Sequence, residues 1–242
     1  TLCSKEVIDK RDDLGEDIVL QYDELSDKAK EKARDWFAES VFTDSHDWEC
    51  VYEDAVTVAA LFGLEIKTST ETYYVTGRGG KPLSRSRTRT HIMFSGFSSQ
   101  GDGACFEGTY AYRADALAAV KAHAPQDEAL HAIVEALQDA QAAAGFRVKL
   151  DIKHGCSRYV HERTMDMELS DDSGYDDEGN ALPESSLVTH EQQTAVQEAL
   201  IRFAEWIYGQ LEQEYEYMTS DDSVAENIRA NGYEFLESGE RY

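Results

Sequence analysis

The sequence predicts an α+β fold, in which an antiparallel β-meander of about five strands packs against several helices and a long amphipathic helix lies near the C-terminus. The apolar residues recur about every 3.6 residues in some segments, as in helices, and every second residue in others, as in strands. Glycine, proline and helix-capping residues separate these segments. Hydrophobic residues make up 41% of the chain, enough for a core. We expect a flexible arm at 1–16 and one α+β domain over 17–242.

The first predicted elements are a short strand over 18–22 and a helix capped by Ser26. The apolar residues of this helix fall on a single stripe, and charged residues cover its other faces. A second helix is expected over 52–62, with Gly63 as its C-cap. The stripe of the first helix consists of Ala29, Ala33, Trp36, Phe37 and Val41.

Strand patterns begin after Gly63. Residues 65–75 and 88–97 are rich in Thr, Tyr, Ile and Val, and a glycine-containing tip joins them as a hairpin. A third strand, 105–113, follows the segment Ser–Gln–Gly–Asp–Gly. These three strands are the start of the meander.

Two helices, two strands and two further helices complete the chain. Asp115 and Asp127 are the expected N-caps of the two helices that follow the meander. The clearest strand alternates apolar and charged residues from Phe146 to His154, and Thr189 with Gln192 forms a capping box before the longest helix. The expected helices span 115–124, 127–144, 190–217 and 220–230, the strands span 146–154 and 158–169, and a tail follows.

Negative charge is concentrated in the last third of the chain. The net charge is -25, and residues 162–242 hold 21 acidic and four basic residues, against 27 and 19 in residues 1–161. Part of this charge lies in an acidic loop at 170–187, which contains glycine and serine and is expected to be disordered. Because the composition predicts a folded core, most of the remaining acidity must cover a folded surface.

Four glutamates recur at every seventh position of the longest predicted helix. This spacing aligns them on one face at intervals of about 10 Å. Such a row imitates the charge of a nucleic-acid backbone and favours a basic partner, although a solvated helix face is the alternative. The candidate partner-binding residues are Glu191, Glu198, Glu205, Glu212, Glu216, Asp221 and Asp222.

A cluster of basic residues occupies the predicted hairpin at 77–90. It is suited to an acidic partner or an RNA segment, and equally to the protein's own acidic surface or a second subunit. Elsewhere, the charge of the chain disfavours direct nucleic-acid binding. The cluster consists of Arg78, Lys81, Arg85, Arg87 and Arg89.

Several motifs of enzymes and nucleotide-binding proteins are missing from the sequence. It has no G-x-x-x-x-G-K-[ST], G-x-G-x-x-G, H-E-x-x-H or G-x-S-x-G motif, and no EF-hand loop. We therefore assign no catalytic residue. A candidate binding loop over 96–108 contains Ser98, Gln100, Asp102 and Glu107, but no histidine to act as a general base.

His154, Cys156 and His161 are the one group that suggests a metal. A zinc site needs a fourth ligand, and none is evident. A partly buried histidine and an incidental cysteine are the favoured interpretation, so no metal or cofactor is expected.

The cysteines and the hydropathy indicate an intracellular protein. The four cysteines lie far apart, which favours reduced thiols over a disulfide framework. No apolar run is long enough to cross a bilayer, and residues 1–15 are polar. We expect a cytoplasmic protein that does not bind membranes.

Three stretches resemble a known family. They are YDELSDKAKEKARDW from Tyr22, SGFSSQGDGACFEG from Ser95, and EYEYMTSD from Glu214 together with IRANGYEF from Ile228. They are similar to a family of phages, prophages and their bacterial hosts whose members are commonly labelled antitoxins of toxin–antitoxin stability systems. The resemblance covers most of 18–238, and the glycine-rich loop is its most specific part. The chain departs from the family in its N-terminal arm, its arginine-rich hairpin and the segment CSRYVH from Cys156.

Charge and resemblance together predict a non-enzymatic protein of host–phage conflict. It would bind and inhibit a basic nucleic-acid-handling protein, as an antitoxin or as an anti-defence inhibitor of the anti-CRISPR or DNA-mimic type. One alternative is an enzyme or small-ligand binder that acts on a nucleotide or signalling molecule at the glycine-rich loop. The other is a structural or regulatory phage protein that self-associates through its exposed strands and basic hairpin.

Overall fold

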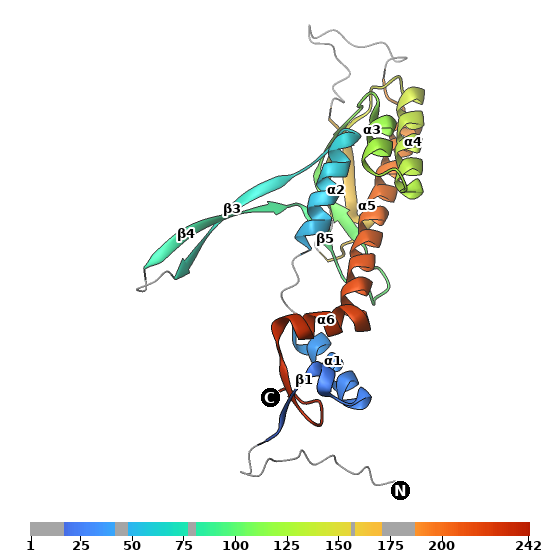
Figure 1. Cartoon of the computed structure of the whole chain (residues 1–242). Coiled ribbons are helices and arrows are strands. Elements are labelled where there is room, and N and C mark those ends of the chain that lie inside the picture. Colours follow the sequence, from blue (N-terminus) through green and yellow to red (C-terminus); the bar gives the residue numbers. More distant parts are fainter. Residues whose placement is uncertain (1–16, 42–47, 77–80, 156–157, 171–186) are drawn as a thin grey trace. The chain divides into compact units, whose positions relative to one another are not determined.

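The computed structural model describes residues 17–41, 48–76, 81–155, 158–170 and 187–242 (Figure 1). The expected arm at 1–16, nearly all of the acidic loop, Arg78 and Cys156 lie outside these ranges. The described residues form six α-helices and ten antiparallel strands, which confirms the α+β class. The chain forms two compact units, Thr1–Trp48 with Gln213–Tyr242 and Glu49–Glu212. That residues 17–242 act as one domain stays a prediction.

The smaller unit contains α1 (Asp27–Val41), and the side chain of Val41, the last residue of the predicted stripe, lies outside the described part of the chain. Ala29, Ala33 and Phe37 are buried as predicted, and Trp36 is half-buried. β1 (Val19–Gln21) pairs with β10 (Glu234–Leu236), where only a tail was expected. A strand of three residues is too short to show alternation, and its partner lies at the other end of the chain. The unit also contains η1 (Tyr22–Glu24) and α6 (Asp221–Asn231), and its core consists of Tyr22, Leu25, Ala29, Ala33, Phe37, Val224, Ala225, Ile228 and Phe235.

The larger unit is built on α5 (His190–Thr219) as far as Glu212. The predicted capping box is present: the amide of Gln192 donates to Oγ1 of Thr189 (3.3 Å), and the amide of Thr189 donates to Oε1 of Gln192 (3.0 Å). On the buried face of α5, Phe203 lies edge-on to Phe62, with ring centres 4.9 Å apart. This face anchors the core of the unit.

Three further helices belong to the larger unit, α2 (Glu49–Leu61), α3 (Ala116–His123) and α4 (Glu128–Ala143). Asp127 is the N-cap of α4 as predicted, since its Oδ1 accepts the amide of Leu130 at 2.8 Å. Its other oxygen accepts the indole N–H of Trp206 at 2.8 Å, which joins α4 to α5. Asp115 occupies the N-cap position of α3 as predicted, but its φ is 58° and its side chain makes no capping hydrogen bond.

The strands expected as one meander separate into three sheets. Each of the three extended segments predicted as the start of the meander is divided into two strands by a single residue. The two strands of a segment pair with different segments. The ribbon β3–β4 extends away from the helices of its unit (Figure 1). The pairs are β2 (Leu64–Ile66) with β7 (Gly108–Ala111), β3 (Thr68–Thr76) with β4 (Pro82–Thr90), and β5 (Ile92–Phe94) with β6 (Ala104–Phe106).

Three peptide groups close a ring where the strands change partners. The amide of Lys67 donates to the carbonyl of Glu107 (2.8 Å), Glu107 donates to His91 (3.0 Å), and His91 donates to Lys67 (2.9 Å). Each residue both donates and accepts, so its backbone is satisfied where regular pairing stops. We call Lys67, His91 and Glu107 the strand junction.

The four-stranded sheet continues from β7 to β8 (Lys149–His154) and β9 (Met165–Leu169) in the order β2-β7-β8-β9. β8 starts at Lys149 and not, as predicted, at Phe146. Gly145 and Phe146 both have positive φ, which turns the chain, and Phe146 is exposed and packs on Tyr112. The strand expected over 158–169 is also shorter than predicted, because the turn η2 (Glu162–Thr164) precedes β9.

Gln141, a fully buried polar residue, connects α4 to the start of β8. Its Nε2 donates to the carbonyl of Val148 (2.7 Å), and its Oε1 accepts the amide of Val148 (3.3 Å). The same Nε2 lies 3.3 Å from the hydroxyl of Tyr110. The side-chain amide therefore substitutes for a neighbouring strand.

We predict that Gln141→Leu lowers the free energy of unfolding by about 2–4 kcal/mol, because both backbone groups of Val148 are left without a buried partner. Urea denaturation measures the change. Gln126→Leu, at an exposed position, is the matched control and should change stability by less than about 0.5 kcal/mol. Equal effects of the two substitutions would contradict the assigned role of Gln141.

Candidate functional site

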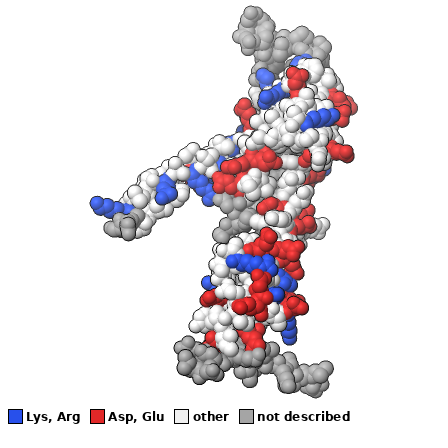
Figure 2. Space-filling model, in the orientation of Figure 1, with Lys and Arg blue, Asp and Glu red and all other residues white. Residues whose placement is uncertain are grey.

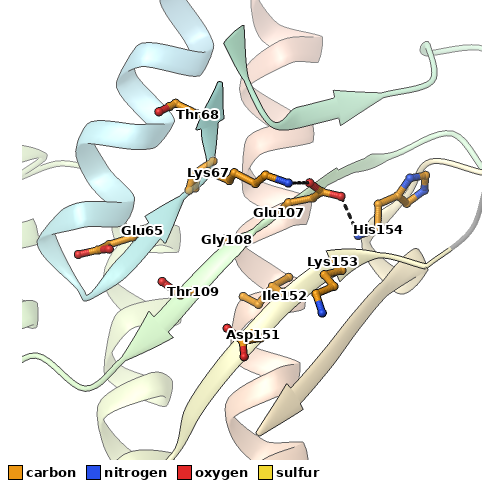
Figure 3. A pocket seen from close by; sticks show the side chains of 11 residues that line it. Glu65, Lys67, Thr68, Glu107, Gly108, Thr109, Asp151, Ile152, Lys153 and His154 are labelled. Carbon is orange, nitrogen blue, oxygen red and sulfur yellow. Dashed lines mark hydrogen bonds and ion pairs between the residues drawn. The ribbon is translucent and has the colours of Figure 1, made fainter. Parts of the chain in front are cut away.

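A groove of about 620 Å³ follows the sheet across β2, β7 and β8 (Figure 3). Gly108 lies in its lining, where any side chain would collide with the carbonyl oxygen of Glu65. Glycine at this position lets β7 approach β2 closely. Side chains of both charges line the groove, among them Glu65, Lys67, Glu107, Asp151, Lys153 and His154.

Glu107 is the most connected of these groups. Its Oε2 lies 3.0 Å from Nζ of Lys67 and 2.9 Å from Nδ1 of His91, and its Oε1 accepts the amide of His154 at 3.4 Å. Figure 3 shows the side chains of Lys67 and Glu107 directed at each other. The hydrogen bonds from Lys67, the His154 amide and His91 hold the pKa of Glu107 below its ordinary value, against the effect of partial burial. The carboxylate is therefore ionised near neutral pH.

His91 connects this carboxylate to a serine. Its Nε2 lies 3.0 Å from Oγ of Ser69, on the side of the ring away from Glu107. An ionised carboxylate accepts the proton on Nδ1, which leaves the lone pair of Nε2 to accept the hydroxyl of Ser69. Three side chains, one from β3 and two from the single residues that link strands, thus form one hydrogen-bonded chain.

Ser69 and His91 were not predicted as site residues from the sequence. Glu107 was considered only with its neighbours in the glycine-rich loop, which contain no histidine. The available signal was the pairing expected for the hairpin, which brings the segments around Ser69 and His91 together.

The other three residues of the candidate binding loop lie apart from the groove lining. Oδ2 of Asp102 accepts the amides of Ser98 (2.9 Å) and Ser99 (2.6 Å), which closes the loop on itself. The hydroxyl of Tyr208 donates to the carbonyl of Gly96 at 3.0 Å and ties the loop to α5. Ser98 and Gln100 are exposed, whereas Glu107 alone of the four lines the groove.

Three of the five basic residues predicted for the hairpin, Arg85, Arg87 and Arg89, share one face of the ribbon, whereas Lys81 precedes β4 and is exposed. The register places Ser69 opposite Arg89, Glu71 opposite Arg87 and Tyr73 opposite Arg85. Residues opposite each other in an antiparallel pair project on the same side, so the arginines line one face. The other face carries mostly Thr and Ser. Figure 2 shows basic side chains gathered along the ribbon, which we call the arginine face after Arg85, Arg87 and Arg89.

The glutamate row is exposed as predicted. Glu191, Glu198, Glu205 and Glu212 all face solvent on α5. Its centre is partly neutralised, since Arg163 lies 3.6 Å from Glu198, and Arg202 falls between Glu198 and Glu205 on the helix surface.

The remaining acidic candidates belong to the smaller unit. Glu216, Asp221 and Asp222 are exposed. Asp221 and Asp222 occupy the first turn of α6, whose N-cap is Ser220, and negative charge stabilises that end of a helix. Asp221 also pairs with Arg34 at 3.2 Å. These two aspartates therefore have a structural role.

The histidines considered for metal binding have other partners. Nε2 of His154 lies 2.8 Å from the carbonyl of Tyr159, and Nδ1 of His161 accepts the amide of Arg163 at 3.2 Å. No group of three or more His, Cys, Asp and Glu residues suited to a metal ion occurs within the described ranges. Cys105 is buried, which raises the pKa of its thiol to about 11, and Cys50 is exposed.

Fold and site together define an α+β protein with a groove of mixed charge on one sheet and a projecting β-ribbon with an arginine face. Residues 48–221 match the family described as Domain of unknown function (DUF8835), and the chain belongs to that family. Comparisons with curated proteins and with solved structures found no match. Among the helices that the structure describes, none has the length and apolar character needed to span a bilayer.

We predict that Glu107→Gln destabilises the protein near neutral pH by about 1–2 kcal/mol, because it weakens charge-assisted hydrogen bonds. Lys67 is more than half exposed, so solvent screening favours the lower value. The pKa of Glu107 is lower in the folded than in the unfolded chain. Its stabilising effect is therefore present above the unfolded value and is lost as the pH falls through the folded value.

Denaturation of both proteins between pH 7 and pH 3 tests this prediction. The difference in unfolding free energy should shrink toward the acidic end. Glu65→Gln, in the same groove, is the control. A difference that is constant with pH would exclude the assigned role of the carboxylate.

Proposed function

We propose that the chain binds and inhibits a basic, nucleic-acid-handling protein through the glutamate row of α5. The observation that carries the proposal is that Glu191, Glu198, Glu205 and Glu212 are all exposed on one helix. They recur at about 10 Å along a helix whose opposite face is buried in the core. A groove built to hold phosphates would attract such a row by long-range electrostatics.

The charge of the whole chain supports the proposal. With a net charge of -25, the protein attracts basic surfaces and speeds encounter with them. The resemblance to phage and prophage antitoxins suggests a toxin, a nuclease or a defence complex as the target. We propose that it acts in the cytoplasm of the host cell.

We predict that the combined substitution Glu198→Lys, Glu205→Lys and Glu212→Lys lowers affinity for the partner at least tenfold. The reversed charges repel a basic surface that the native glutamates attract. The partner is first captured from a host lysate at about 50 mM salt, and its affinity is then measured with purified components. Raising the salt to about 200 mM should also weaken binding to the unmodified chain steeply.

The matched control is Glu128→Lys with Glu135→Lys and Asp139→Lys, which reverses three exposed acidic residues of α4. It changes the net charge equally but leaves the glutamate row intact. Affinity should be largely retained. Equal weakening in both variants, or binding that salt does not weaken, would count against the glutamate row as the binding surface.

A second candidate function, binding of nucleic acid, is favoured by the arginine face of the ribbon. A two-stranded β-ribbon fits the major groove of B-DNA, and arginine binds both phosphates and guanine. Arg85 and Arg89 are exposed, and so is Tyr73, which lies opposite Arg85. The ribbon would thus present positive charge at a distance from the acidic helices of its unit.

We predict that the unmodified chain binds duplex DNA with an affinity that falls between about 50 and 200 mM salt. Replacing Arg85, Arg87 and Arg89 by alanine should reduce the salt-dependence slope by about 0.9 for each phosphate that the variant no longer neutralises. Fluorescence anisotropy measures both quantities. Alanine at Thr70, Thr72 and Thr88, on the other face, should leave the affinity and its salt dependence unchanged.

Sedimentation separates DNA binding from self-association of the chain. A dimer that the arginine substitutions dissociate would assign the ribbon to an interface between copies.

A further inference from the structure

We propose that Ser69, His91 and Glu107 form a hydrolytic triad at the strand junction, in which Ser69 attacks the carbonyl carbon of an ester bearing an anionic group. This activity is additional to partner binding and does not depend on it. The residues come from β3, from the link between β4 and β5, and from the link between β6 and β7.

The order of the atoms matches the roles that such a triad requires. Nε2 of His91 lies 3.0 Å from Oγ of Ser69, and Nδ1 lies 2.9 Å from Oε2 of Glu107. The carboxylate fixes the proton on Nδ1, so Nε2 is the basic nitrogen and faces the serine. Lys67 binds the same oxygen of Glu107 and keeps the carboxylate in place.

The burial of the three side chains suits a reactive group. The side chains of His91 and Glu107 are 24% and 20% exposed, and Ser69 is partly buried. This burial excludes part of the surrounding water while leaving a route for a substrate. Thr68, which precedes Ser69, lines the groove, whereas the side chain of Ser69 projects from the other face of β3, on the same side of the ribbon as Arg89.

The side-chain hydrogen bonds are not needed to join the strands. The ring of backbone hydrogen bonds at Lys67, His91 and Glu107 already connects the three strands. Alanine at Ser69 would leave this ring unchanged. A hydroxyl placed at the basic nitrogen of an oriented histidine is therefore better explained by chemistry than by strand pairing.

Positive charges near the serine indicate the class of substrate. Arg89 lies directly opposite Ser69 on the same face of the ribbon, where its Nη1 is 3.4 Å from Oε1 of the exposed Glu71, and Lys67 is bonded to Glu107 at the junction. A carboxylate or phosphate on the ester would be attracted to these cations. A carboxylic ester with an anionic group is the substrate that this arrangement fits.

The reaction consumes only water. Oγ of Ser69 bonds to the carbonyl carbon while its proton moves to Nε2 of His91, and the bond to the ester oxygen then breaks as His91 protonates the leaving alcohol. Water attacks the resulting acyl-serine and gives a proton to His91. The bond to Ser69 breaks, Oγ takes that proton back, and the acid leaves as its carboxylate and a proton.

A fluorophosphonate probe, which reacts with activated serines, tests the proposal on the full chain. Mass spectrometry should find the adduct on Ser69, and Ser69→Ala should abolish it. His91→Asn should lower the labelling rate about 100-fold or more, the usual effect of removing a general base. The exposed Ser84 of the same ribbon supplies the control Ser84→Ala, which should label as the unmodified chain does.

Hydrolysis of two esters tests the substrate class. Arg89→Ala should raise KM about tenfold for the 4-nitrophenyl half-ester of succinate, with little change in kcat, and leave 4-nitrophenyl acetate unaffected. Circular dichroism and thermal unfolding establish that each variant is folded. A folded, unmodified chain without an adduct on Ser69, or a folded His91→Asn variant that labels at the unmodified rate, would overturn the triad.

Discussion

The ring of three backbone hydrogen bonds at Lys67, His91 and Glu107 is the constraint on which the arrangement of the strands in the larger unit depends. Three strands meet there, and each changes its partner after a single residue. The pairing of β3 with β4 forms the ribbon, and the pairing of β2 with β7 joins the four-stranded sheet. The pairing of β5 with β6 leads to the glycine-rich loop. The side chains of these residues also bond to one another through the carboxylate of Glu107, so the point that organises the strands also contains a network of polar side chains.

The helices were largely predictable because their signals are local. The stripe of Ala29, Ala33 and Phe37 is buried, and the caps at Asp127 and Thr189 form the hydrogen bonds that their sequences indicate. The strands were placed in the right regions but grouped into one meander. Alternation shows which residues can be extended, whereas the exchange of partners depends on pairing between distant segments. The turn at Phe146 was missed because a positive φ is rare for a residue with a side chain.

The candidate sites also divide into those that a local sequence pattern predicts and those that depend on contacts between distant segments. The exposure of the glutamate row follows from the helical period and was predicted, but the pairing of Glu198 with Arg163 joins different elements and was not. Ser69, His91 and Glu107 are separated by 22 and 16 residues, and no short motif spans them. A charge pattern can be read along one helix. A hydrogen-bonded chain that joins β3 to two links between strands appears only when the register is known.

The length of the ribbon and the position of its base connect it to the residues of the strand junction. Its strands of nine residues extend for about 30 Å. A ribbon of two strands is only marginally stable by itself, so its base at the junction must restrain it. Ser69 and Arg89 face each other at that base, beside His91. If a partner that twists the ribbon changed the distance between Ser69 and His91, binding on the ribbon and binding at Ser69 would influence each other by equal free energies.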